Sequence, residues 1–317
     1  MPRMSDFRPP TVLVLVGPTA VGKTAVVTAL AGLAPIEIVS ADSRQLYRSL
    51  DIGTAKPSGA ERAAAPYHLL DVALPTERFS AGRFALEAAQ GIRGIQGRGR
   101  LPVVVGGTGF YVRALFQGLF AEPPLDPARR AALRDALAPL PAATVHRWAI
   151  RLDPGFAGGG RQRAARAIEI ALLTGRPLSE LHHAARPGAP ALSAWYARLA
   201  LPREVLAERI RARAQAMLDA GLVDEVRRVL AAGVPPDAPG LSAVGYPEVL
   251  EHLEGRLPAA HLAATIAAAT RRYAKRQETW LRHQLRGPTA MFDARQPAKA
   301  LAQAVLAGYR AATAAPT

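Results

Sequence analysis

A phosphate-loop motif directly after a short apolar run constrains this chain more than any other feature. Residues 12–16 are Val-Leu-Val-Leu-Val, and residues 17–24 are Gly-Pro-Thr-Ala-Val-Gly-Lys-Thr, which fits the pattern G-x-x-x-x-G-K-T. In this pattern a buried strand leads into a loop whose backbone N–H groups bind phosphate oxygens, and a helix follows. The motif therefore predicts an α/β fold with a parallel sheet and a phosphorylated ligand.

The residue types of the loop suit phosphate binding. Glycine lets the backbone approach a phosphate, Lys23 supplies positive charge, and the Thr24 hydroxyl is a ligand for Mg²⁺. Most of the 40 basic residues are arginine, and lysine occurs only at positions 23, 56, 275 and 299. A lysine kept at position 23 favours a site that needs a compact ammonium group. A glycine-rich turn without a ligand is the alternative.

Composition limits the classes of function. The chain has no cysteine, which excludes disulfides, a thiolate nucleophile and Cys-ligated zinc. A net charge of +15 favours a polyanionic partner such as nucleic acid, although genomic base bias can also enrich arginine. The apolar runs are too short for a membrane span or a signal peptide, so we expect a cytoplasmic protein that does not bind membranes.

Short apolar runs alternate with helical patterns along the chain, which is typical of βαβ units. We expect strands at residues 12–16, 36–39, 68–72, 103–105 and 198–201. We expect helices at residues 23–31, 81–97, 127–138, 142–149, 161–174, 203–220, 223–232, 246–254, 261–284 and 298–314.

A long helical stretch without strands separates the fourth and fifth expected strands. We therefore expect a core formed by residues 1–119 and 193–317, with a helical insertion domain at residues 120–192. The Pro- and Gly-rich segments 122–124 and 187–190 are expected to act as hinges between the two.

Two further loops follow expected strands. Asp42 comes after the second strand, at the edge where open α/β sheets bind ligands, and suits a base. The alternative is that Asp42 or Ser43 is an ordinary helix N-cap. The fourth strand leads into Gly106-Gly107-Thr108-Gly109, where a kinase or ATP hydrolase would often carry a metal-binding acid. Glycines there allow close approach of substrate and Thr108 can donate to a phosphate, although a plain tight turn would have the same composition.

Taken together, these motifs resemble those of bacterial tRNA dimethylallyltransferases, the tRNA isopentenyltransferase family. The matching stretches are residues 17–24, 40–47, 51–57, 68–71, 106–109, 161–163, 166–169, 244–246 and 270–280. The resemblance implies a P-loop NTPase-like parallel sheet core flanked by helices, with a helical insertion domain that contacts tRNA.

The resemblance implies transfer of a dimethylallyl group from dimethylallyl diphosphate to the exocyclic amine of the adenosine 3′-adjacent to the anticodon. The implied catalytic residues are Asp42 as general base, Lys23, and Thr24 as the Mg²⁺ ligand. The implied diphosphate-binding residues are Gly17, Pro18, Thr19, Ala20, Val21, Gly22, Lys23, Thr24, Arg203 and Arg209. For the two arginines, a solvated basic helix face is the alternative.

The family also implies contacts with the anticodon stem-loop of tRNA, whose target base would have to leave its stack. The implied tRNA-binding residues are Asp42, Ser43, Arg44, Gln45, Thr108, Arg130, Gln162, Arg163, Ala164, Ala165 and Arg166. Lys56 is taken as a loop residue outside the catalytic set, while His68, Trp195 and Trp280 are interpreted as packing residues. A monomer is expected.

One segment departs from the family. Residues 155–160 are Gly-Phe-Ala-Gly-Gly-Gly, where the family usually carries His-Pro-Asn-Asp before the helix at residue 161, so an N-cap and an acidic partner are missing there. Other functions remain open: a P-loop kinase of a small metabolite, a noncatalytic RNA-binding protein, or a related enzyme that prenylates free adenine nucleotides.

Overall fold

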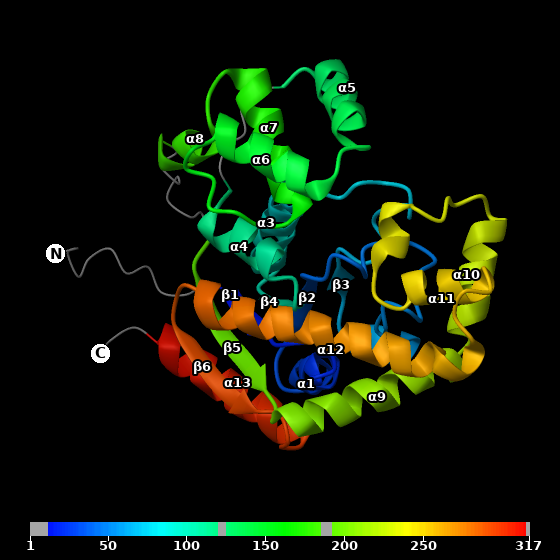
Figure 1. Cartoon of the computed structure of the whole chain (residues 1–317). Helices are drawn as coiled ribbons and strands as arrows, with labels where there is room; N and C mark the ends of the chain where they lie inside the picture. The colour runs from blue at the N-terminus through cyan, green and yellow to red at the C-terminus, as the bar shows by residue number, and fades with distance from the viewer. Residues whose placement is uncertain (1–11, 120–124, 185–191, 315–317) are drawn as a thin grey trace. The chain divides into compact units, whose positions relative to one another are not determined.

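The computed structural model describes residues 12–119, 125–184 and 192–314 of the 317-residue chain. The chain divides into two compact units, one formed by Met1–Gln117 with Pro190–Thr317 and one formed by Gly118–Ala189 (Figure 1). The hinge segments predicted at residues 122–124 and 187–190 lie outside the described residues.

The first unit is built on a six-stranded sheet, which confirms the predicted parallel α/β fold. Its strand order is β3-β2-β4-β1-β5-β6, and every neighbouring pair is parallel. The strands are β1 (Val12–Val16), β2 (Ile36–Ser40), β3 (Tyr67–His68), β4 (Leu101–Gly106), β5 (Ala194–Ala200) and β6 (Thr289–Asp293).

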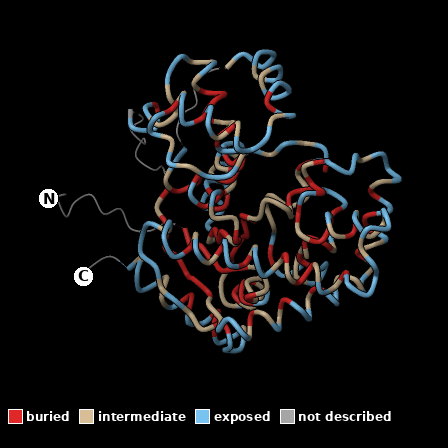
Figure 2. The backbone as a smooth tube through the Cα atoms, in the orientation of Figure 1, coloured by how far each residue is buried: buried red, intermediate tan, exposed pale blue. Residues whose placement is uncertain are grey.

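Helices bury both faces of this sheet, as the burial map of Figure 2 shows for the central strands. Val12, Val14 and Val16 of β1 pack on one face, and Leu13 and Leu15 pack on the other. A continuous apolar run, without polar alternation, is what a central parallel strand requires.

The helices of the first unit divide between the two faces. One face carries α1 (Lys23–Ala31) and α13 (Ala298–Thr313). The hydrophobic cluster of the other face contains side chains of α3 (Ala81–Gly97), α4 (Gly109–Gln117), α9 (Arg203–Asp219) and the long α12 (Ala259–Gln284). The helices α10 (Leu222–Ala231) and α11 (Tyr246–Leu253) join this cluster by packing on α9 and α12. The short α2 (Gly59–Ala64) precedes β3. Within the described part of the chain, no helix is both long and apolar enough to cross a membrane.

The second unit is helical and has a small core of its own. It contains α5 (Pro127–Leu137), α6 (Ala142–Leu152), α7 (Arg161–Thr174) and α8 (Leu178–Ala184), packed around Leu137, Val145, Ala149, Ala164, Ala167 and Ile168. The helix α7 begins after Gly160 without a side-chain cap, as the departure from the family pattern predicted. Buried Asp153 holds the glycine segment instead, because it accepts from the backbone N–H groups of Gly155 and Ser179.

The structure corrects several predicted elements. The strand predicted at residues 68–72 is wrong beyond residue 68, because Leu69 and Asp71 have positive φ values of 63° and 56° that interrupt an extended chain. The predicted start of the fifth strand is also wrong, since β5 begins at Ala194. The strand β6 was not predicted, because it is a partly exposed edge strand with a weak apolar pattern. The helices α2, α4 and α8 were also missed.

Candidate active site

The phosphate loop leaves the carboxyl end of β1 and is held in a tight curve. Gly22 has a φ of 102°, and Ala20 has a φ of 63°, so the loop turns through the left-handed region twice before α1 begins. Gly17 is required for a different reason, since a Cβ atom there would lie 2.8 Å from the Leu199 carbonyl oxygen. The curve faces the N-terminus of α1, where free N–H groups and the helix dipole favour an anion.

Lys23 lies over this loop. Its Nζ donates to the carbonyl oxygens of Gly17 at 2.9 Å and Pro18 at 2.8 Å. Burial lowers the pKa of Lys23 to about 8, while the negative charge of Asp42 acts in the opposite direction. An ammonium group that has lost water in this way gains strongly from an anionic ligand.

Two arginines of α9 reach the loop region. Arg209 donates to the carbonyl oxygens of Val21 and Ala294, both at 3.2 Å. Arg213 is half-buried, and its positive charge helps to lower the pKa of Lys23. Burial lowers the pKa of Arg213, and the negative charge of Asp42 raises it. Arg203 is the exposed first residue of α9, and no described hydrogen bond joins it to the loop.

The sequence therefore predicted Arg209 but did not single out Arg213. Residues 209 and 213 are four positions apart, so both lie on the same face of α9. That spacing was available in the sequence and pointed to Arg213. A cavity of about 690 Å³ lies beside Arg213, between α9 and the turn at residues 51–59.

Asp42 follows β2, at the edge of the sheet where the phosphate loop leaves β1. Its Oδ1 accepts from the Arg44 backbone N–H at 2.9 Å, and the residues that follow form turns, so the alternative of a helix N-cap is not what the structure contains. Asp42 is an electrostatic neighbour of Lys23, Arg213 and Tyr273, whose pKa values all respond to its charge. A carboxylate and a phosphate loop thus share one edge of the sheet.

The neighbours of Asp42 are tied to other loops of the first unit. Thr108 accepts from the Ser43 backbone N–H at 3.0 Å and donates to the Ser43 hydroxyl at 3.3 Å. Arg44 donates to the Pro239 carbonyl at 3.2 Å and to the Ser242 hydroxyl at 2.8 Å. Thr108 therefore links the loop after β4 to the segment that carries Asp42.

The loop after β4 is closed by α12. Buried Gln277 accepts from the Thr19 backbone N–H and donates to the Gly107 carbonyl, both at 2.9 Å, so it joins this loop to the phosphate loop. Cβ atoms at Gly106, Gly107 and Gly109 would overlap with Ala41, Gln277 and Trp280 respectively. A metal-binding acid of the kinase type has no room at these positions. The sequence identified the motif at residues 270–280 without identifying this role of Gln277.

The predicted tRNA-binding residues of the second unit differ in their surroundings. Arg130 and Arg166 both form ion pairs with buried Glu169, as does Arg134. Gln162 and Arg163 are exposed and Ala165 is half-buried, whereas Ala164 packs in the core of the unit. The side chain of Ala164 is thus a packing residue, and the exposed polar members remain candidates for RNA contact.

The sequence of this chain is similar to those of known proteins over almost its whole length. A family model described as IPP transferase matches residues 45–284, and one described as Isopentenyl transferase matches residues 10–71. A protein named tRNA dimethylallyltransferase from Paracidovorax citrulli (strain AAC00-1) is 45% identical over 295 residues, covering 86% of this chain and 84% of the relative. A protein of the same name from Stenotrophomonas maltophilia (strain K279a) is 43% identical over 315 residues, covering 95% of this chain and 98% of the relative.

Solved structures with the same fold belong to proteins of this kind. A full-length tRNA isopentenylpyrophosphate transferase from Bacillus halodurans matches with a TM-score of 0.69 and 32% identity, covering 95% of this chain and 97% of that chain. A eukaryotic dimethylallyltransferase acting on tRNA matches with a TM-score of 0.75 and 25% identity, covering 90% of this chain and 74% of that chain.

Proposed function

The chain belongs to the IPP transferase family, and on that premise we propose that it is a tRNA prenyltransferase. It moves a dimethylallyl group from dimethylallyl diphosphate to the exocyclic amine of the adenosine 3′-adjacent to the anticodon. The observation that best supports this reaction is that Asp42 and the phosphate loop follow β2 and β1 at the same edge of the sheet, where the charge of Asp42 acts on both Lys23 and Arg213. A proton acceptor and a set of diphosphate-binding cations then meet across a single site.

The phosphate loop binds the diphosphate leaving group. Backbone N–H groups of residues 17–24 bond its oxygens, and Lys23, Arg209 and Arg213 supply positive charge around them. As the bond between carbon and oxygen breaks, negative charge grows on the diphosphate, and fixed cations stabilise it most at that moment. Arg203 is the weakest member of the predicted set, because its side chain is exposed at the start of α9.

The donor groups of the site are compatible with Mg²⁺. The described residues contain no cluster of three or more His, Cys, Asp or Glu side chains, and Thr24 offers one hydroxyl oxygen at the start of α1. This ion usually takes few protein ligands and shares its oxygen shell with water and substrate phosphates, so such a donor set fits it. When bound, Mg²⁺ would neutralise charge on the diphosphate, with Thr24 as its protein ligand.

Asp42 acts as the general base on the acceptor. The exocyclic amine of adenine is a poor nucleophile because its lone pair is delocalised into the ring, so removal of a proton during attack assists the reaction. Thr108 bonds Ser43, the residue after Asp42, and Tyr273 is an electrostatic neighbour of Asp42, so both are candidates for contact with the base. The target nucleotide must leave its stack to reach Asp42, as in other enzymes that modify a base.

The tRNA is held by basic and polar groups of both units. Ser43, Arg44 and Gln45 adjoin Asp42, while Arg130, Gln162, Arg163 and Arg166 supply positive and polar groups on the second unit. The net charge of +15 supports a polyanionic substrate of this kind. We expect the protein to act as a monomer in the cytoplasm, where its tRNA substrate is found.

The reaction can be tested by following labelled dimethylallyl diphosphate into unmodified tRNA that carries adenosine next to the anticodon. The wild-type protein with Mg²⁺ should place the label in tRNA, and Asp42→Ala should lower the rate by about 10²- to 10⁴-fold, the usual contribution of a general base. Free adenosine monophosphate serves as a second acceptor, because label in the nucleotide alone would indicate the related enzyme.

An incubation with ATP and no prenyl donor distinguishes the kinase alternative. Tight packing at Gly106, Gly107 and Gly109 argues against a kinase-type metal site, so no ATP turnover is expected. Consumption of ATP here, together with no label in tRNA in the assay with labelled dimethylallyl diphosphate, would contradict the prenyltransferase assignment.

A further inference from the structure

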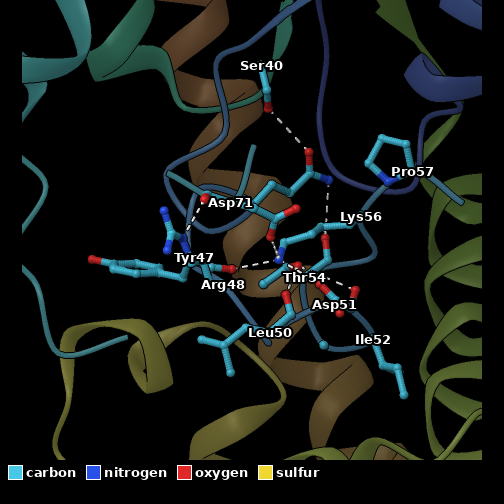
Figure 3. Close-up of polar contacts among 12 residues, drawn as sticks. Ser40, Tyr47, Arg48, Leu50, Asp51, Ile52, Thr54, Lys56, Pro57 and Asp71 are labelled. Atoms are coloured by element: carbon cyan, nitrogen blue, oxygen red, sulfur yellow. Dashed lines mark hydrogen bonds and ion pairs between the residues drawn. The ribbon is translucent and has the colours of Figure 1, made fainter. Parts of the chain in front are cut away.

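Lys56 is a buried lysine on the first unit that no step of the proposed reaction uses. Its side chain is only 1% exposed, and its Nζ donates to the Tyr47 carbonyl at 2.6 Å, to Asp51 Oδ1 at 2.6 Å and to Asp71 Oδ1 (Figure 3). A lysine ammonium has three N–H groups, and these three acceptors take all of them. Lys56 therefore has no donor left for a phosphate, and its role must act through its neighbours.

The three acceptors come from three different segments. Tyr47 is the last residue of the segment at residues 42–47, here called the acceptor segment, which starts at Asp42. Asp51 is the first residue of the turn that contains Lys56. Asp71 follows β3. Arg62 also donates to Asp71, at 2.9 Å. A buried ammonium is costly to leave without partners, so these contacts hold the three segments in one fixed arrangement.

Gln45 makes a second connection between the same turn and the acceptor side of the site. Its Nε2 donates to the Ala55 carbonyl at 3.0 Å and the Thr54 carbonyl at 3.3 Å, and its Oε1 accepts from the Ser40 hydroxyl at 3.3 Å. Ser40 is the last residue of β2, two positions before Asp42. The turn therefore supports the segment at residues 42–47 through Gln45 and Tyr47, and Gln45 links that segment to the end of β2.

The opposite side of the turn is fixed by a buried carboxylate. Glu225 of α10 accepts from the backbone N–H groups of Asp51 at 2.8 Å, Ile52 at 2.7 Å and Gly53 at 3.1 Å. The Tyr246 hydroxyl donates to the same carboxylate at 2.8 Å, and its ring fills the space that a side chain at Gly53 would need. The turn is thus a rigid support between α10 and the acceptor segment.

We propose that Lys56 is a positioning residue that fixes the Asp42 carboxylate through Tyr47 and the acceptor segment. This inference rests on the proposed function, in which Asp42 takes the proton from the adenine amine. A base works only within hydrogen-bond reach of that proton, and a displacement of about 1 Å costs on the order of 10²-fold in rate. The phosphate loop does not depend on this support, because Gln277 and Arg209 hold it from other helices.

The test is single-turnover transfer of labelled dimethylallyl to tRNA by Lys56→Met, a variant of similar length without the charge. We expect the rate of transfer to fall about 10- to 100-fold, whereas KM for dimethylallyl diphosphate stays within about threefold of wild type. In an Asp42→Ala background the same change should cost much less, since two residues that act through one group are not additive.

The matched control is Glu37→Gln, which removes the charge of another buried side chain that forms ion pairs, at the opposite end of the same strand β2. Glu37 pairs with Arg98 and His68, each at 2.7 Å. Its loss should lower thermal stability without changing the rate of transfer per folded molecule. If Lys56→Met behaves like Glu37→Gln, with lower stability and an unchanged rate, the positioning role is wrong.

Asp51→Asn keeps the test decisive if Lys56→Met does not fold. The Asp51 carboxylate is 60% exposed, so the fold should tolerate the change, and we expect a decrease in rate of about three- to tenfold from the weakened support. An unchanged rate in a folded Asp51→Asn protein, or a raised KM for the diphosphate with unchanged rate in either variant, would overturn the proposal. Failure of the wild-type protein to label tRNA would instead refute the proposed function.

Discussion

The phosphate loop and the acceptor segment at residues 42–47 leave the same edge of one sheet, yet different kinds of interaction maintain their shapes. The curve of the phosphate loop comes from its own residues, with Lys23 bonded to Gly17 and Pro18 and with Gly22 in the left-handed region. Gln277 and Arg209 hold this loop from other helices. The acceptor segment depends mainly on side chains that lie outside it, above all Lys56 and Thr108.

This difference has consequences for function. The phosphate loop can bind a diphosphate even when the acceptor segment is displaced, because its supports, Gln277 and Arg209, are not those of that segment. The position of the acceptor segment depends instead on Lys56 and Thr108. The phosphate loop and the acceptor segment form the two half-sites. A substitution in one half-site should therefore impair the function of that half-site and leave the other largely intact. The predictions below test this separation from the largest expected effect to the smallest.

Arg213 and Arg203 provide the sharpest test of the diphosphate side. Arg213→Met removes a charge that lies beside Lys23 and Asp42, and we expect KM for dimethylallyl diphosphate to rise about 10- to 100-fold, as for loss of a charged hydrogen bond. Arg203→Met is the matched control on the same helix and should change KM less than about threefold, as at an exposed site. Steady-state assays with saturating tRNA measure both, and equal effects would refute the assignment of Arg213.

The pH dependence of diphosphate binding should follow Lys23. Because burial lowers the pKa of Lys23 to about 8, the ammonium is charged below that pH and loses its proton above it. We expect KM for dimethylallyl diphosphate to be constant from about pH 7 to 8 and then to rise by up to about tenfold per pH unit. Lys23→Arg stays charged and should abolish this break at lower overall activity. A flat wild-type profile up to pH 9.5 would show that Lys23 does not titrate as described.

Gln277 joins the phosphate loop to the loop after β4, whose Thr108 bonds Ser43 of the acceptor segment. Its removal should therefore affect both sides, by less than the changes above. Gln277→Met leaves the Thr19 N–H and the Gly107 carbonyl without their buried partner, at a cost of about 1–3 kcal/mol in the free energy of unfolding. Denaturant unfolding measures that loss, and we expect rises of a few fold in KM for both substrates. A change confined to one substrate would mean that the loops are not coupled through Gln277.

What could be predicted from the sequence follows the same division. The loop at residues 17–24, the start of α1 at Lys23 and the parallel sheet depend on local patterns, and the structure contains them as expected. The strand predicted after His68 failed because positive φ values at Leu69 and Asp71 depend on the surrounding loops.

The supports of the acceptor segment were not predictable in this way. Lys56 was interpreted as a loop residue, because no local pattern reveals that its ammonium meets Asp71 and Tyr47. Gln277 lies 258 residues from its partner Thr19, a separation that neither periodicity nor spacing can bridge. Arg213 is an intermediate case, since its i,i+4 relation to Arg209 was visible in the sequence.

Equilibrium binding of dimethylallyl diphosphate to Asp42→Ala, measured by calorimetry with Mg²⁺ and without tRNA, tests the separation of the half-sites most directly. Removal of a negative charge beside Lys23 and Arg213 should leave Kd unchanged or lower it several-fold, while transfer to tRNA falls by about 10²-fold or more. If Asp42→Ala instead loses diphosphate binding to the same extent as it loses transfer, the two sides form one inseparable site and the account is contradicted.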